Sequence, residues 1–120
     1  MNVTYKAENL ELTPDVRAYA EEKLEAVQKL LSNYAPENVA CDVALVKDDA
    51  HQSGNIYRAD VTVHAGSEHV HAVGHGESLM AALDEVKDEL ARRIRREKDK
   101  EETMFRKGGA MLKRMMKWGR

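Results

Sequence analysis

The stretch Arg58-Ala59-Asp60-Val61-Thr62-Val63-His64-Ala65-Gly66-Ser67-Glu68-His69-Val70-His71-Ala72-Val73 decides the fold of this 120-residue chain. From Arg58 to Ala65, polar residues alternate with small or apolar ones, which is the period of a strand with one buried face. Gly66-Ser67 signals a turn, and residues 69–73 alternate again. We therefore predict two consecutive strands that pair through a short turn.

Two more strands are predicted upstream of this pair. Residues 39–45 place Val39, Cys41, Val43 and Leu45 at every second position, and residues 2–7 form a shorter alternating stretch around Val3 and Tyr5. The polar segment 47–55 between the second and third strands contains Gly54 and is predicted to be a loop.

Between the first two strands lies a predicted helix that begins at a clear start signal. Thr13 is a suitable N-cap, Pro14 occupies the first helical position, and Asp15 places negative charge in the first turn. Apolar residues then recur at steps of three and four: Val16, Tyr19, Ala20, Leu24, Val27, Leu31 and Tyr34. This spacing predicts an amphipathic helix of about six turns that ends before Pro36.

A second, longer helix follows the strands. We interpret Gly74-His75-Gly76 as a break, after which Ser78 caps a helix with an apolar stripe of Leu79, Leu83, Val86, Leu90 and Ile94. Beyond about Lys100 the pattern changes, and Gly108-Gly109 interrupts any continuous helix.

The order of these elements predicts an α+β fold, β-α-β-β-β-α. Two helices would pack on one face of a four-stranded sheet, and a basic C-terminal tail would follow. We predict an α+β domain over residues 1–100 and a basic, Met-rich tail over residues 101–120 that is disordered when unbound.

Composition excludes several classes of protein. Cys41 is the single cysteine, so there is no internal disulfide framework and no Cys-rich zinc site. No apolar run approaches the ~20 residues that span a bilayer, and residues 1–6 do not resemble a signal peptide. We therefore expect a cytoplasmic protein.

Charge is segregated along the chain. Residues 87–120 contain 13 Lys and Arg against 6 Asp and Glu, although the whole chain has a formal net charge of −2. Within this region Arg92, Arg93, Arg95, Arg96, Lys98 and Lys100 lie within nine residues. One or two cations would suffice to complement a helix dipole, so this density favours binding of a polyanion. RNA is favoured over a membrane because the apolar stripe of the helix is needed for the core.

The tail allows several interpretations. Its cations alternate with apolar residues, among them Met111, Leu112, Met115, Met116 and Trp118. Such a segment could lie on a membrane surface, dock in the groove of a protein partner, or follow an RNA groove with Trp118 stacking on a base. It could also be a disordered tail with no specific role.

Other candidate chemistry is weak. His64, His69, His71 and His75 lie within twelve residues and could bind zinc or copper. No cysteine lies in this cluster and no carboxylate spacing completes a site, so an exposed sheet face that carries histidines is the better explanation, and we predict no metal site. Cys41 falls on the apolar side of its strand, which indicates a core residue and not a nucleophile. We predict no catalytic residues, no cofactor and no enzymatic activity.

Three passages resemble the ribosome hibernation-promoting factor and ribosome-associated inhibitor family, and their order and spacing together carry the resemblance. The passage at residues 9–24 (Asn9-Leu10-Glu11-Leu12-Thr13-Pro14, Val16-Arg17 and Glu22-Lys23-Leu24) is similar to the family's opening strand-to-helix passage. Ala59-Asp60-Val61-Thr62-Val63 is similar to its third strand. Residues 74–94, from Gly74-His75-Gly76-Glu77-Ser78 to Leu90-Ala91-Arg92-Arg93-Ile94, are similar to the entry into its second helix.

The resemblance implies a ribosome hibernation factor that binds the small ribosomal subunit and its rRNA in the mRNA/tRNA channel. It would inhibit translation during stress or stationary phase, with no membrane partner and, as a short form, no dedicated dimerisation domain. The resemblance places rRNA contacts at Lys23, Lys29, Arg92, Arg93, Arg96 and Lys100, and the basic density of the second helix adds Arg95. The tail has no counterpart in the resemblance; from its own chemistry, its possible contacts are Arg106, Lys107, Lys113, Arg114, Lys117 and Trp118. The alternative is an adaptor that docks on a membrane surface or a protein partner through the basic Met/Trp tail.

The chain also departs from the family pattern. Glu8 stands where a basic residue is common, Ala26 interrupts a basic series on the first helix, and Met80 replaces a frequent tyrosine. These departures predict that the first helix is the weaker RNA contact.

Overall fold

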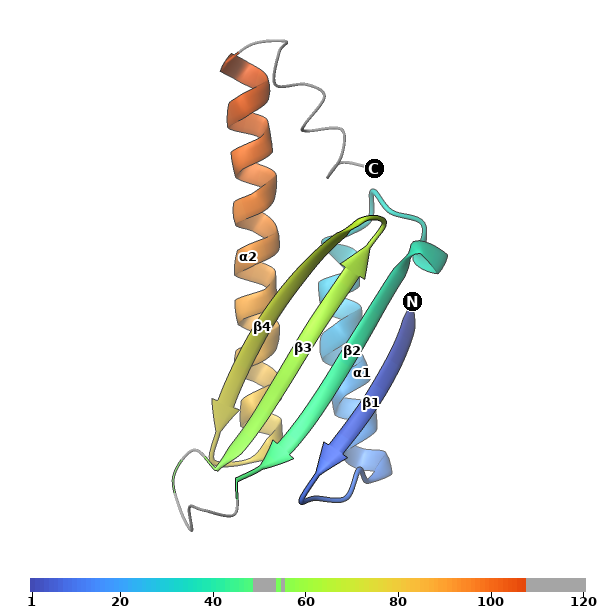
Figure 1. Cartoon of the computed structure of the whole chain (residues 1–120), viewed down its shortest axis with the longest axis vertical. Coiled ribbons are helices and arrows are strands. Elements are labelled where there is room, and N and C mark those ends of the chain that lie inside the picture. The colour runs from blue at the N-terminus through green and yellow to red at the C-terminus, as the bar shows by residue number, and fades with distance from the viewer. Residues whose placement is uncertain (49–53, 55, 108–120) are drawn as a thin grey trace.

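One mixed sheet of four strands forms the base of the molecule, in the spatial order β1-β2-β3-β4 (Figure 1). The strands are β1 (Asn2–Glu8), β2 (Val39–Lys47), β3 (Tyr57–Ala65) and β4 (Glu68–Gly76). This computed structural model describes residues 1–48, 54 and 56–107, and it describes side chains up to residue 99.

The register of the sheet explains the alternation of the sequence. β1 runs parallel to β2, while β2–β3 and β3–β4 are antiparallel. Gly66 turns the chain between β3 and β4 with a φ of +60°, a conformation that glycine adopts without strain. Cys41, Val61 and Val63 point to the covered face of the sheet and are almost fully buried. The alternate residues, including His64 and His71, lie on the open face.

Helix α1 (Pro14–Lys29) starts as predicted and ends earlier than predicted. The Thr13 hydroxyl accepts a hydrogen bond from the Val16 N–H at 3.3 Å. After Lys29 the chain tightens into turns, in which the Leu31 N–H donates to the Gln28 carbonyl at 2.9 Å. Leu31 and Tyr34 are nevertheless buried, because these turns keep their side chains on the core side. The expectation of six helical turns was therefore wrong, since the apolar spacing continues where the helix does not. A short 3₁₀ helix, η1 (Pro36–Asn38), then leads into β2.

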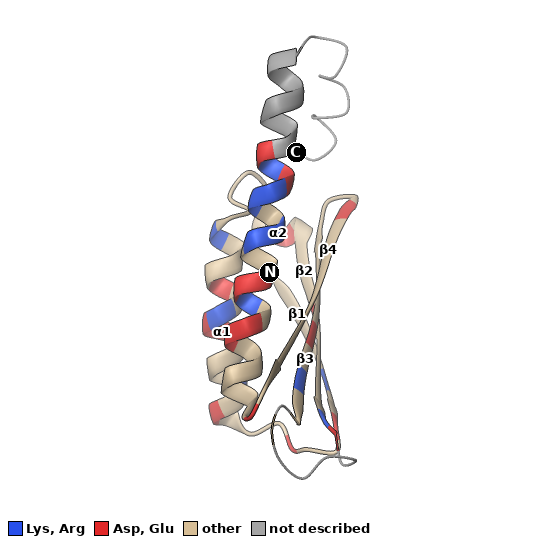
Figure 2. Cartoon of the chain, turned by 90° about the vertical axis from the view of Figure 1, so that its left-hand side faces the viewer, with Lys and Arg blue, Asp and Glu red and all other residues tan. Residues whose placement is uncertain are grey.

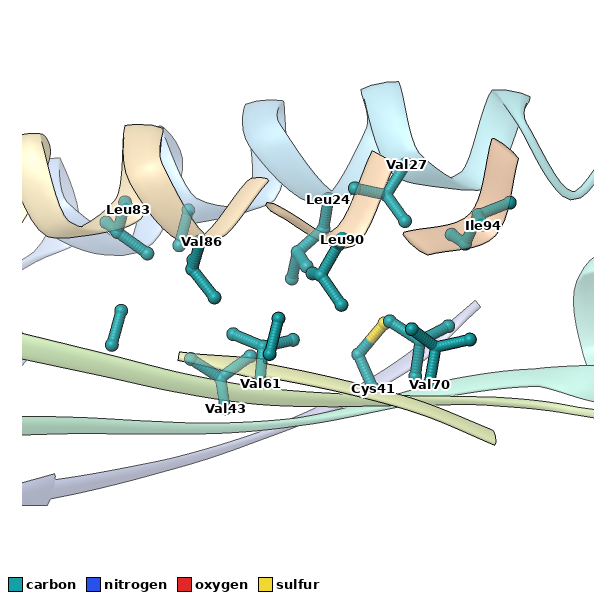
Figure 3. Packing of buried hydrophobic residues seen from close by; sticks show 14 of the residues in the cluster. Leu24, Val27, Cys41, Val43, Val61, Val70, Leu83, Val86, Leu90 and Ile94 are labelled. Atoms are coloured by element: carbon teal, nitrogen blue, oxygen red, sulfur yellow. The ribbon is translucent and has the colours of Figure 1, made fainter. Parts of the chain in front are cut away.

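Helix α2 (Leu79–Lys107) lies beside α1 on the same face of the sheet (Figures 1 and 2). Its start is capped by Ser78, whose hydroxyl accepts a hydrogen bond from the Ala81 N–H at 3.1 Å. The two helices and the sheet enclose one hydrophobic core, shown in Figure 3: Leu24 and Val27 from α1, Leu83, Val86, Leu90 and Ile94 from α2, and Cys41, Val43, Val61 and Val70 from the strands. The predicted α+β fold and element order are confirmed.

Strand β4 does not end where the glycines suggested. It continues through Gly74 and Gly76, so the predicted break at this point was wrong. A Cβ atom on Gly74 would lie 2.4 Å from the Ala82 carbonyl oxygen and 2.4 Å from the Val86 nitrogen. These glycines therefore allow the backbones of β4 and α2 to approach closely, and they do not interrupt the strand.

Helix α2 also extends past residue 100, where we predicted the domain would end, and its backbone stays helical to Lys107. In Figure 1 this part of the helix projects beyond the end of the sheet. Whether residues 101–120 act as a separate tail stays a prediction. Neither helix, over the residues described, has the length and apolar run that a membrane crossing requires.

Candidate nucleic-acid interface

The cations of α2 lie on two sides of the helix, separated by the buried residues Leu90 and Ile94. Figure 2 shows basic residues gathered around the middle of α2, before the part of the helix drawn in grey. Arg92 and Arg95, three residues apart, line a groove toward α1, whereas Arg93 faces the edge strand β4. Arg96 lies between and lines both grooves. The sequence showed the density of these cations but not their division.

Arg93 is engaged within the fold. Its Nε donates to Glu89 Oε1 at 2.8 Å, and its Nη1 donates to the backbone carbonyl of His71 at 2.9 Å. The hydrogen bond from Arg93 is the main reason that the pKa of Glu89 is lowered. Arg92 also approaches Glu89, at 2.5 Å. Arg93 thus fastens α2 to strand β4, and only part of its guanidinium is available to a ligand.

Arg95 and Arg96 are different, because within the described part of the chain neither has an ion-pair partner. Both are exposed. With Arg92 they border a groove of about 690 Å³ between the two helices. Ala26 and Leu30 of α1 also line this groove, which we call the interhelical groove. Three of the predicted contacts are therefore brought together at one feature.

The sequence did not reveal the roles of two lysines in this region. Lys87 lines the interhelical groove but was not predicted to contact RNA; its spacing of eight residues from Arg95 on one helix was the available signal. Lys98 donates a hydrogen bond to the backbone carbonyl of Leu30, just after the end of α1. Lys98 therefore satisfies a free carbonyl at that end, a structural task.

Lys23 lies in a contact between the helices, on the half-buried side of α1. Its Nζ is 3.2 Å from Asp84 Oδ1 and 4.8 Å from the centre of the Tyr19 ring. The Tyr19 hydroxyl donates to the same oxygen at 2.6 Å. The Lys23 side chain is only 25% exposed. Its charge is paired, so the structure separates Lys23 from the arginines of α2. Lys29 is exposed in the last turn of α1 and outside the groove lining.

The Tyr19–Lys23–Asp84 cluster gives a prediction for stability. The hydrogen bond from Tyr19, with a further contribution from Lys23, lowers the pKa of Asp84 below its ordinary value of 3.8. Because the unfolded chain then binds this proton more tightly than the folded chain, the contribution to stability is present above pH 3.8 and is lost as the pH falls through the folded pKa. Asp84→Asn should lower the free energy of unfolding at pH 7 by about 1 kcal/mol or less.

Urea unfolding of Asp84→Asn and the parent chain between pH 7 and pH 2 measures this effect. The difference in the free energy of unfolding between the two proteins should disappear at low pH. Asp88→Asn serves as the control, since that carboxylate is 71% exposed on the same helix. A gap that stays constant at every pH would contradict the role assigned to Asp84.

A comparison with known families identifies the fold and its class of protein. The sequence model described as "Sigma 54 modulation protein / S30EA ribosomal protein" matches residues 3–102. The chain belongs to this family.

Relatives within the S30EA family support the same assignment. The chain is 30% identical over 100 residues to the ribosome hibernation promotion factor of Picosynechococcus; the match covers 83% of this chain and 50% of that protein. The chain thus spans about half the length of that relative. It is also 30% identical over 100 residues to the ribosome hibernation promoting factor of Salmonella typhimurium, of which it covers 96%.

Solved structures agree with the S30EA fold. The N-terminal domain of Thermus thermophilus Protein Y superposes with a TM-score of 0.64 at 26% identity, covering 80% of this chain and 98% of that one. A ribosomal subunit interface protein from Coxiella burnetii superposes with a TM-score of 0.64 at 13% identity, which shows likeness of fold alone.

The S30EA match ends at residue 102, so all of the predicted tail contacts lie beyond it. Lys113, Arg114, Lys117 and Trp118 fall outside the described residues. Lys100, Arg106 and Lys107 are described only as backbone of α2. The tail contacts, and the alternative of membrane or partner docking through the tail, therefore stay predictions.

The histidine cluster lies on the open face of the sheet, away from the interhelical groove. His64 Nε2 is 3.1 Å from Asp42 Oδ2, and His71 Nε2 is 2.6 Å from Asp60 Oδ1. Among the described residues, no three His, Cys, Asp or Glu side chains are grouped so as to hold a metal ion. Cys41 is fully buried in the core, and burial raises the pKa of its thiol to about 11. The prediction of Cys41 as a core residue is confirmed.

Proposed function

We propose that this protein is a ribosome hibernation factor that binds the small ribosomal subunit in its mRNA/tRNA channel and inhibits translation by occupying it. The observation that carries the proposal is the set of exposed arginines, Arg92, Arg95 and Arg96, on an S30EA domain whose relatives are named ribosome hibernation promoting factors. Stress and stationary phase are the conditions in which silencing idle ribosomes is useful, and the cytoplasm is the compartment that this role requires.

The physical basis is neutralisation of RNA phosphates. Each phosphate that a Lys or Arg neutralises releases condensed counterions, so affinity depends steeply on salt. Folded rRNA presents phosphates and 2′-hydroxyls in a fixed shape, which a rigid helix can match without reading base sequence. Occupancy of the channel excludes mRNA and tRNA sterically, so the proposed inhibition needs no catalytic group and no cofactor.

We rank the proposed contacts by their surroundings in the fold. Arg92, Arg95 and Arg96 are the principal ones because they border the interhelical groove. Arg93 and Lys29 are secondary, since Arg93 also donates a hydrogen bond to the His71 carbonyl and Lys29 lies at the end of α1. Lys23 contributes through the position of α1 against α2, because its charge is paired with Asp84.

Co-sedimentation with purified ribosomal subunits tests the function directly. We expect the protein to sediment with small subunits at about 50 mM salt, and affinity to fall at least about 100-fold at about 200 mM. Large subunits should bind much more weakly under the same conditions. Absence of binding to small subunits at the lower salt would refute the proposal. In a reconstituted translation reaction, added protein should reduce initiation in parallel with its binding to small subunits.

A further inference from the structure

The interhelical groove has an apolar floor, which a purely electrostatic contact does not need. Ala26 and Leu30 come from α1, and Ala91 comes from α2. Ala26 and Leu30 are half-buried and Ala91 is 5% exposed, so the apolar side chains that line the groove are largely shielded from solvent. Each helix contributes one alanine to this floor, and these small side chains leave open space between the helices. The result is a hollow between the helices and not a flat cationic surface.

The rim of the groove consists of charged side chains that follow one another along α2. Four cations border it, namely Lys87, Arg92, Arg95 and Arg96, against two carboxylates, Asp88 and Asp99. Asp88, Arg92, Arg95 and Asp99 follow at steps of four, three and four residues and therefore share one side of the helix. The two arginines lie in the middle and the two carboxylates lie at the ends. Lys87 Nζ is 3.4 Å from Asp88 Oδ1 and offsets the carboxylate at that end. An anion is therefore attracted most strongly to the arginines at the centre of the groove.

We propose that this groove seats one unpaired nucleotide of RNA, with its base over the Ala26–Ala91 floor and its phosphates against Arg92 and Arg95. This inference rests on the proposed function and specifies how the RNA is held. A phosphate alone would leave the apolar floor in contact with water, whereas the face of a base covers it. The groove volume of about 690 Å³ falls in the range of sites that enclose a small ligand.

The chemistry of the rim suits an unstacked base better than a duplex. Single-stranded segments of RNA expose base faces that stack on aromatic rings or on the planes of arginine side chains. No aromatic side chain lines this groove in the described part of the chain, so the planar side chains that line it are Arg92, Arg95 and Arg96. No backbone amide or hydroxyl group is needed for this mode, so we expect little preference among the four bases.

The test fills the groove without changing any charge. Ala26→Leu adds three carbon atoms at the floor of the groove, at a position that is half-buried and outside the hydrophobic core. We expect affinity for purified small subunits to fall about tenfold, the loss of one base contact. The salt dependence of binding should be unchanged, because every cation remains. Ala18→Leu is the matched control, since Ala18 is exposed on the same helix and does not line the groove.

A second measurement tests the nucleotide site independently of ribosome binding. In fluorescence anisotropy with single-stranded and duplex RNA of equal length, the parent chain should prefer the single strand, and Ala26→Leu should lose that preference while Ala18→Leu keeps it. Thermal melts of all three proteins check that each is folded. Equal binding of Ala26→Leu and the parent to both targets overturns the nucleotide site but leaves ribosome binding intact. Failure of the parent chain to bind small subunits overturns the proposed function itself.

Discussion

Replacing Arg92, Arg95 and Arg96 together by Glu is expected to reduce affinity for the small ribosomal subunit at least about 100-fold, at a cost of about 1 kcal/mol or more for each reversed contact. All three side chains are exposed and border the interhelical groove. Reversal therefore replaces attraction for phosphate by repulsion without disturbing the core. Replacing the same residues by Gln should make the salt dependence of log K shallower by about one per cation.

The matched control reverses three cations elsewhere. Lys6, Arg17 and Arg58 are exposed on β1, α1 and β3, outside the interhelical groove, and their change to Glu alters net charge by the same amount. If binding depended only on net charge, the two triple variants would be equally impaired. Such a result, with both proteins folded by circular dichroism, would show that the groove is not the contact surface.

Gly74→Val is expected to destabilise the fold by about 3 kcal/mol or more, the upper range for overpacking a well-packed site. The new Cβ would lie 2.4 Å from the backbone oxygen of Ala82 and 2.4 Å from the backbone nitrogen of Val86. A backbone cannot move aside as a flexible side chain can, so α2 must shift away from β4. For a domain of this size the melting temperature should fall by roughly 12 °C or more.

Ala44→Val is a suitable control for Gly74→Val. Ala44 is half-buried on β2, and its side chain points to the open face of the sheet, on which neither of the described helices packs. The added methyl groups should change the melting temperature by only a few degrees. A stable Gly74→Val protein with an unchanged melting temperature would contradict the close approach of β4 and α2. A displaced α2 should also weaken small-subunit binding, because the groove is formed by both helices.

The cations of α2 illustrate why a count of charges does not define a binding site. Arg93 and Lys98 belong to the same basic segment as Arg95 and Arg96, yet they donate to the carbonyls of His71 and Leu30. Those carbonyls come from segments distant in sequence, so no local pattern indicates these contacts. Lys23 is a similar case, because its partner Asp84 lies on the other helix. Each of these residues is expected to influence binding through the arrangement of the helices.

The sequence by itself determined the order of elements, the two buried faces and the helix starts, because each follows from contacts between residues close in the chain. Alternation in residues 58–73 defined β3 and β4, and Thr13 and Ser78 marked the starts of the helices through their own hydroxyl groups. The density of cations after residue 91 was equally visible. These features depend on periods of two and 3.6 residues and on cap chemistry.

Tertiary structure alone decided which glycines end a strand and which cations remain free. Gly74 was predicted to interrupt the strand because glycine often does so. It lies within β4, and glycine is required there because α2 passes too close for a Cβ atom. Ala26 on α1 and Arg95 on α2 line the same interhelical groove, although three strands lie between these two helices in the sequence. The physical reason is the same in both cases. Close approach and charge pairing depend on distances across the fold, and sequence spacing does not encode those distances.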